Sequence, residues 1–369
     1  MPPLVFLLSA AVFAQGTSEF VVSGLLGQVA AGTGVSVGTA GLLTSAFAAG
    51  MVVGAPLLAT MAGSVPRRPA LVALLGVFTA AHVVAALTTN FPLLLASRVL
   101  SAFANAGFLA VALAALPVFV PAAGLPRATA ALLSGVTLAC IVGVPAGTVL
   151  GQEFGWHAAF WAIAAVTALV AAVLPATRTR LDSPATGTVR HEWRVLGRTD
   201  LRTAVLLGIL VNGATFAGFT YLGTMTSDGW VPVVLAGFGI GSFAGVTTAG
   251  RLGEKHRERL VVMGGAVLTV VWLAAYVAAH SLAGLLVFSI LTGAAAFAVG
   301  STLIGTIVAT AAPRAPRIAG AIATTAFNAG AVLGPALAGP VVAATDAKAA
   351  LWVSAACTAA AALVARLRR

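Results

Sequence analysis

The chain has few charged residues, and this shortage excludes an ordinary soluble protein. Only 8% of its 369 residues are charged and 60% are hydrophobic, whereas about a quarter of the residues in a soluble domain are charged. The two cysteines, Cys140 and Cys357, lie inside apolar stretches, so no disulfide framework is expected. The five histidines lack metal-ligand spacing, and no Gly-x-x-x-x-Gly-Lys phosphate loop occurs. We therefore expect no metal, no cofactor and no use of ATP.

Long apolar runs fill most of the chain. A helix needs about 20 largely apolar residues to cross about 30 Å of hydrocarbon, and the alternating pattern of a membrane β-barrel is missing. The sequence predicts an all-α integral membrane protein with twelve spans, divided into two sets of six. They are Leu4–Leu26, Ser36–Ala62, Ala70–Leu87, Phe91–Val118, Ala128–Leu150 and Ala158–Leu174, followed by Thr203–Met225, Trp230–Ala249, Leu260–Ala279, Leu282–Ala311, Ile318–Ala343 and Ala349–Val364.

The basic residues indicate how the chain is oriented. All 20 Lys and Arg residues except Arg98 and Lys348 lie in every second gap between the apolar runs or in the last segment of the chain. Basic loops resist translocation and stay on the cytoplasmic side. This sorting predicts a multi-pass membrane protein with both termini in the cytoplasm. Arg far outnumbers Lys, and Ala and Gly are abundant, which indicates a bacterium and so a bacterial inner membrane. The net charge of +11 is spread over many loops, so nucleic acid is not expected as a partner.

The longest polar stretch divides the chain into halves of similar size. It predicts an N-terminal six-helix bundle at 1–176, a cytoplasmic linker at 177–202 and a C-terminal six-helix bundle at 203–369. Transporters built from repeated halves bind their substrate between the halves near the bilayer midplane. An enzyme is disfavoured, because no span combines a nucleophile with a base or supplies a metal-ligand set.

Two ionisable residues inside predicted spans are candidates for function. Glu19 is the only acid within any predicted span, and a charge at the bilayer centre costs at least about 2.5 kcal/mol. Arg98 lies at a similar predicted depth on another span. We hypothesise that Arg98 pairs with Glu19 in one state and favours its ionised form, and that separation in another state favours the protonated form. The alternatives are a structural hydrogen bond at Glu19 and a permanent ion pair.

Polar and aromatic residues on four spans are candidates for binding substrate. Gln15, Glu19 and Ser23 recur on one face of the first span, and Arg98, Ser101 and Asn105 do so on the fourth. In the second half, Asn212, Phe216, Tyr221 and Asn328 offer an apolar lining with a few hydrogen-bonding groups. Ordinary packing between helices is the alternative for each of them.

Several short motifs resemble those of a known family. Gly250-Arg251-Leu252-Gly253-Glu254-Lys255 and Arg67-Arg68 occupy corresponding loops, although the first-half loop lacks the acid. Leu94-Leu95-Ala96-Ser97-Arg98 is similar to an intramembrane arginine motif, and Gly143-Val144-Pro145-Ala146-Gly147 to the antiporter motif of drug exporters. These segments resemble the major facilitator superfamily, in particular the twelve-spanner drug:proton antiporters and their chloramphenicol-resistance exporter branch. The connection from Tyr221 to Trp230 is shorter than is usual in that family.

The resemblance implies a function for most of the candidate residues. It implies export of chloramphenicol or a related small drug in exchange for protons, by a monomer whose partners are drug, protons and lipids. Glu19 and Arg98 would couple the proton. Gly143, Pro145 and Gly147 would either seal one face or only pack closely, and the gating loops would use Arg67, Arg68, Gly250, Glu254 and Lys255. An exporter of a sugar or other metabolite and a non-concentrating facilitator or sensor remain alternatives.

Overall fold

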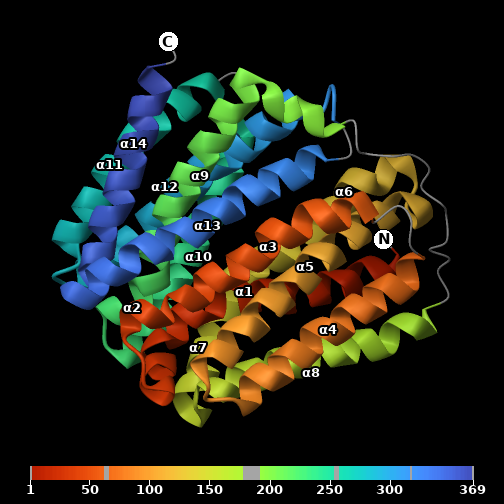
Figure 1. Ribbon diagram of the computed structural model, residues 1–369, viewed down its shortest axis with the longest axis horizontal. Coiled ribbons are helices and arrows are strands. Elements are labelled where there is room, and N and C mark those ends of the chain that lie inside the picture. The colour runs from red at the N-terminus through yellow and green to blue at the C-terminus, as the bar shows by residue number, and fades with distance from the viewer. Residues whose placement is uncertain (1, 62–65, 178–191, 253–256, 316–317, 368–369) are drawn as a thin grey trace.

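The computed structural model describes residues 2–61, 66–177, 192–252, 257–315 and 318–367, and the regular structure within these ranges is helical (Figure 1). Helices satisfy their backbone hydrogen bonds within one segment, as an apolar surrounding requires. The first helix group consists of α1 (Pro3–Thr33), α2 (Val37–Ala40), α3 (Leu42–Met61), α4 (Arg67–Leu87), α5 (Phe91–Phe119), α6 (Leu125–Leu138), the π-helical turn η2 (Ala139–Gly143), α7 (Val144–Phe154) and α8 (Trp156–Val173).

The second helix group follows the longest polar stretch. It consists of α9 (Thr199–Leu222), α10 (Val231–Leu252), α11 (Arg257–Ala278), α12 (Leu282–Ala311), α13 (Ala319–Ala344) and α14 (Ala350–Arg366). Two short 3-10 turns, Gly223–Met225 and Asp228–Trp230, make the connection between α9 and α10. In Figure 1 the first group, coloured red to yellow-green, lies on one side of the molecule and the second group on the other.

The predicted spans fall on these helices with few differences. Eleven helices in the described ranges are long and apolar enough to cross a membrane, and α12 begins and ends at the residues predicted. The prediction of twelve spans is matched only in part, because the ninth, Leu260–Ala279, falls on α11, whose apolar segment Met263–Ala278 is shorter. The second span is divided at Gly41 into α2 and α3, and the fifth is divided by η2. The chain is an all-helical membrane protein.

The two helix groups contact each other near one end of the molecule. The Tyr221 hydroxyl donates to the carbonyl oxygens of Gly38 (3.1 Å) and Pro335 (3.2 Å). Nearby, Gln152 Nε2 donates to the carbonyl of Asp228 at 2.6 Å. Gly38, Gln152, Tyr221 and Asp228 lie at or near the α1–α2, α7–α8 and α9–α10 connections, and Pro335 lies in the second half of α13. We call this region, defined by these five residues and Gly339, the closed end.

Candidate functional site

The polar face of α1 points into the protein. Gln15 and Ser23 are each 1% exposed, and Glu19 between them is partly exposed. Neither amide atom of Gln15 has a hydrogen-bond partner among the described residues. An unpartnered buried amide is unfavourable by about 1–3 kcal/mol. Such a group is available to bind a polar ligand.

Arg98 of α5 is buried against α1. One of its terminal nitrogens donates to the Ser18 hydroxyl at 2.8 Å, and the other donates to the Ser18 carbonyl at 2.9 Å and to the Glu19 carbonyl at 3.5 Å. The guanidinium carbon lies 4.3 Å from the centre of the Phe47 ring, a cation-π contact. A buried cation is therefore held by neutral oxygens and an aromatic face.

Arg98 and Glu19 lie at the same level, but their charged groups are not joined. Both residues lie in the described ranges, and no ion pair joins the Arg98 guanidinium to the Glu19 carboxylate, whereas Arg198 and Asp200 form one at the start of α9. The charges of Arg98 and Glu19 still interact electrostatically. The hypothesis that they pair in one state stays a prediction, and this conformation is one in which the guanidinium is bound to the α1 backbone instead.

Ser18 and His82, which lie beside Arg98, were not singled out from the sequence as candidates. His82 of α4 is 1% exposed, and its Nε2 lies 2.6 Å from the Ser18 hydroxyl oxygen that also accepts from Arg98. Its Nδ1 lies 2.8 Å from the Phe78 carbonyl, and its ring stacks on that of Phe78. Histidine is rare within membrane spans, so its residue type was a signal that could have marked His82. Nothing in the spacing of Ser18 and His82 indicated that α1, α4 and α5 meet here.

An aromatic pocket lies immediately beside this cluster. Phe20, which follows Glu19 in α1, packs against Phe216 (ring centres 5.9 Å apart) and Phe219 (5.8 Å) of α9. The pocket lining is almost wholly apolar, with the Thr215 hydroxyl and the Cys140 thiol as its polar groups. The lining residues are Phe20, Cys140, Val144, Thr215, Phe216, Phe219, Leu235, Phe238, Gly239 and Phe297, which come from both helix groups.

The other predicted substrate residues lie apart from this pocket. The Asn105 amide is within 3.6 Å of the Met51 sulfur in the first group. Asn212 donates to the Phe327 carbonyl at 2.6 Å, and Asn328 donates to its own helix at Thr324. Tyr221 is fully buried at the closed end. Phe216 is thus the predicted second-half residue that the structure places in the pocket.

The antiporter-like segment packs closely on α1. A Cβ atom added at Gly143 would meet the Thr17 hydroxyl and the Phe13 ring, and one at Gly147 would meet Val21 at 2.7 Å. Pro145 is the second residue of α7, but helical backbone of η2 precedes it without a break, so its missing N–H removes one donor from the continuous helix. Small residues let membrane helices approach in this way. The contacts are those of a tight helix seam, and a sealing role stays a prediction.

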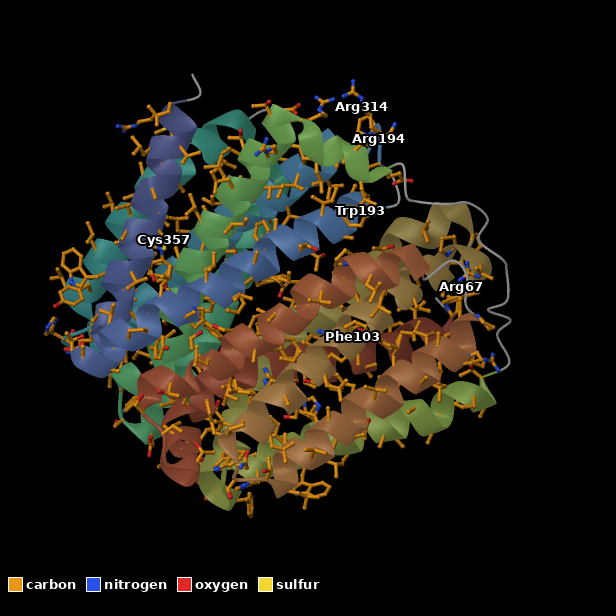
Figure 2. The ribbon with its side chains drawn as sticks, viewed as in Figure 1. Arg67, Phe103, Trp193, Arg194, Arg314 and Cys357 are labelled. Carbon is orange, nitrogen blue, oxygen red and sulfur yellow. The ribbon has the colours of Figure 1, made fainter. Side chains whose placement is uncertain are left out.

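Three of the predicted gating-loop residues are described, at the start of α4 and near the end of α10. Arg67 begins α4 and is 7% exposed, and Arg68 donates to the Pro175 carbonyl at 3.1 Å. Gly250 lies in α10, while Glu254 and Lys255 lie outside the described residues. In Figure 2, Arg67 of the first group lies toward the same side of the view as Arg194, which precedes α9, and Arg314, which follows α12.

Comparison with known proteins identifies the class to which this helical architecture belongs. The family model of the Major Facilitator Superfamily matches residues 8–248 and 221–369, so the chain belongs to that superfamily and is a multi-pass membrane transporter. The predicted family and transport class are confirmed.

Individual relatives cover nearly the whole chain. It is 47% identical over 349 residues to the chloramphenicol resistance protein of Streptomyces lividans, covering 92% of this chain and 88% of that one. It is 32% identical over 343 residues to the inner membrane transport protein YdhP of Escherichia coli K12, covering 91% and 88%. A bacterial homologue of the human lysosomal transporter Spinster, solved inward-facing and unoccupied, has the same fold with a TM-score of 0.78, 16% identity and coverage of 98% and 95%.

Proposed function

We propose that the chain exports a small neutral amphiphilic drug, chloramphenicol foremost, in exchange for protons. One observation carries the proposal: the intramembrane acid Glu19 directly precedes Phe20, a ring of the aromatic pocket. A proton site and an apolar ligand site therefore adjoin on one helix. The relative of 47% identity is named for chloramphenicol resistance, and an aromatic drug suits a lining of phenylalanines.

The two helix groups would act as the moving units. We assign residues 1–176 and 203–369 to two six-helix bundles, joined by a cytoplasmic linker at 177–202, with both termini in the cytoplasm. The contacts at the closed end support a state that is sealed on the outer side and faces inward. Alternating access then requires these contacts to break while the opposite ends approach. Each proton that enters supplies about 2.3 kcal/mol per 100 mV of membrane potential.

Drug accumulation in expressing cells tests the proposal. Cells should hold less chloramphenicol than vector controls, and a protonophore should abolish the difference. Protection against no antibiotic would indicate export of a sugar or other metabolite instead. A difference that persists unchanged with the protonophore would contradict proton coupling, and a chain that never concentrates a solute would be a facilitator or sensor.

Phe216→Ala should weaken drug binding without stopping transport. The variant removes one aromatic partner of Phe20, and such contacts contribute about 0.5–1.5 kcal/mol beyond buried area. We expect the KM for chloramphenicol export to rise about two- to tenfold. Phe6→Ala is the matched control, because Phe6 is 60% exposed on the outside of α1. If the two variants have the same KM, the aromatic pocket is not part of the drug-binding site.

A further inference from the structure

A continuous hydrogen-bond chain joins three helices beside Glu19. Arg98 on α5 donates to the Ser18 hydroxyl on α1. The oxygen of that hydroxyl lies 2.6 Å from His82 Nε2 on α4, and His82 Nδ1 lies 2.8 Å from the Phe78 carbonyl. Arg98, Ser18 and His82 are each at most 1% exposed, so water does not take part in these bonds.

The hydrogen-bond partners of His82 fix a hydrogen on Nδ1 and allow Nε2 to accept. A carbonyl can only accept, so Nδ1 carries a hydrogen and donates to Phe78. Ser18 already accepts from Arg98, and its own hydrogen is used when Nε2 is the acceptor. Every hydrogen bond then donates in the same direction, from Arg98 to Ser18, from Ser18 to His82 and from His82 to Phe78, and the imidazole is neutral.

The surrounding charges favour the same neutral form. Arg98 of α5 faces His82 across a single hydroxyl group, so a protonated ring would place two cations together in a buried site. Glu19 of α1 is the nearby acid, but its carboxylate is not bonded to the ring. From α8 the ring meets Phe160, which does not titrate, at 6.0 Å between ring centres.

We propose that His82 is a positioning residue that holds Arg98 away from the Glu19 carboxylate. As acceptor of the Ser18 hydrogen, His82 turns the lone pairs of that hydroxyl toward Arg98. Without this acceptor, the hydroxyl of a helical serine turns to a carbonyl of the preceding turn. Arg98 then loses one of its bonds to α1, and the anionic acceptor on that helix is the carboxylate of Glu19, whose backbone carbonyl Arg98 already reaches at 3.5 Å. His82 would thereby set the pH at which Glu19 takes up its proton.

Nitrogen-15 NMR of histidine-labelled protein tests the geometry without any transport assay. The signals lost in His82→Leu identify this ring. We expect a neutral ring with hydrogen on Nδ1 that does not change between about pH 5 and about pH 8, where an unperturbed histidine titrates. In Ser18→Ala the Nε2 signal should shift. A ring that titrates in this range, or that carries hydrogen on Nε2, would overturn the proposal.

The pH profile of drug export tests the consequence, which rests on the proposed proton coupling. In His82→Leu, pairing of Arg98 with Glu19 should move the pH midpoint toward acid by about one to three pH units. His82→Gln restores an acceptor near the Nε2 position and should return the midpoint toward that of the parent protein. Ser18→Ala should reproduce the shift, and the double variant with His82→Leu should show no further one.

The outcomes separate a positioning role from a structural one. A lower export rate in His82→Leu with an unchanged midpoint would make His82 a packing residue and refute the proposal. A glutamine variant that folds yet keeps the shifted midpoint would also refute it. Should the parent protein export drug with no pH dependence, the proposed proton coupling fails, while the NMR result still decides whether His82 is the fixed acceptor in the Arg98 chain.

Discussion

Export against a gradient should disappear when Glu19 is replaced by glutamine. Glutamine has nearly the same shape and can still form hydrogen bonds, but it cannot bind and release a proton at physiological pH. In expressing cells, chloramphenicol should therefore accumulate to the level of vector controls. Exchange driven by a drug gradient alone should persist, because the aromatic pocket beside Phe20 is unchanged. Drug-induced proton movement in everted vesicles measures the coupling directly.

Glu153→Gln is the matched control for this variant. Glu153 is an exposed residue near the end of α7, so the same chemical change there should leave export and proton movement intact. A Glu19→Gln protein that still moves protons when drug is added would falsify the assignment of Glu19 as the proton carrier. The site would then have to use another group, because Glu19 is the acid that the sequence places within a span.

Gly38→Ala should open the closed end and slow export. A Cβ atom on Gly38 would meet the Gly339 carbonyl of α13, and Ala343 would lie 3.0 Å away. The nearest of these is backbone, which cannot rotate aside as a side chain does. Overpacking of this kind is destabilising by about 1–3 kcal/mol, so the state joined at the closed end should lose about five- to 150-fold in relative population. Export should fall accordingly, because the cycle passes through that state.

Thiol labelling from outside the cell measures the opening. Ser45 is 6% exposed and donates to the Val332 carbonyl between α3 and α13. With Cys140 and Cys357 replaced, a Ser45→Cys reporter should react faster with an impermeant maleimide when Gly38→Ala is present. Gly27→Ala is the control, because a Cβ atom there has no neighbouring atom within 4 Å. Equal labelling rates in the two variants would show that this glycine contact does not hold the closed end together.

The sequence predicted the helices well, because hydropathy reports how much of a helix meets lipid. The bounds of α12 agree with the prediction at both ends. The division of the second span at Gly41 and the shorter apolar part of α11 were missed. Both depend on local backbone or on which faces of a helix are buried, and a count of apolar residues contains neither.

The sequence predicted how deep the site residues lie in the membrane, but it did not predict which residues they contact. Counting residues from the span ends placed Arg98 and Glu19 at one level, and the backbone contacts between them agree. Depth does not fix which oxygen a guanidinium reaches, so the bonds to Ser18 were not foreseen. His82 was missed for a related reason, since helical periodicity shows the face of a residue and not which helix lies opposite. Tyr221 was expected in a cavity, and its hydroxyl instead crosses to Gly38.

The π-helical turn η2 has a consequence for how the α1 contact can vary. Residues of α6, η2 and α7 that face α1 recur at every fourth position, namely Gly135, Ala139, Gly143, Gly147 and Gly151. In a regular α-helix such a row drifts around the axis, since a turn has 3.6 residues. The wider π turn offsets part of this drift and extends the row along α1. The alignment of this row with α1 thus depends on the number of residues in η2 as well as on side-chain size. Deletion of one residue within Ala139–Gly143 other than Gly143 would turn α7 away from α1 and leave every glycine in place.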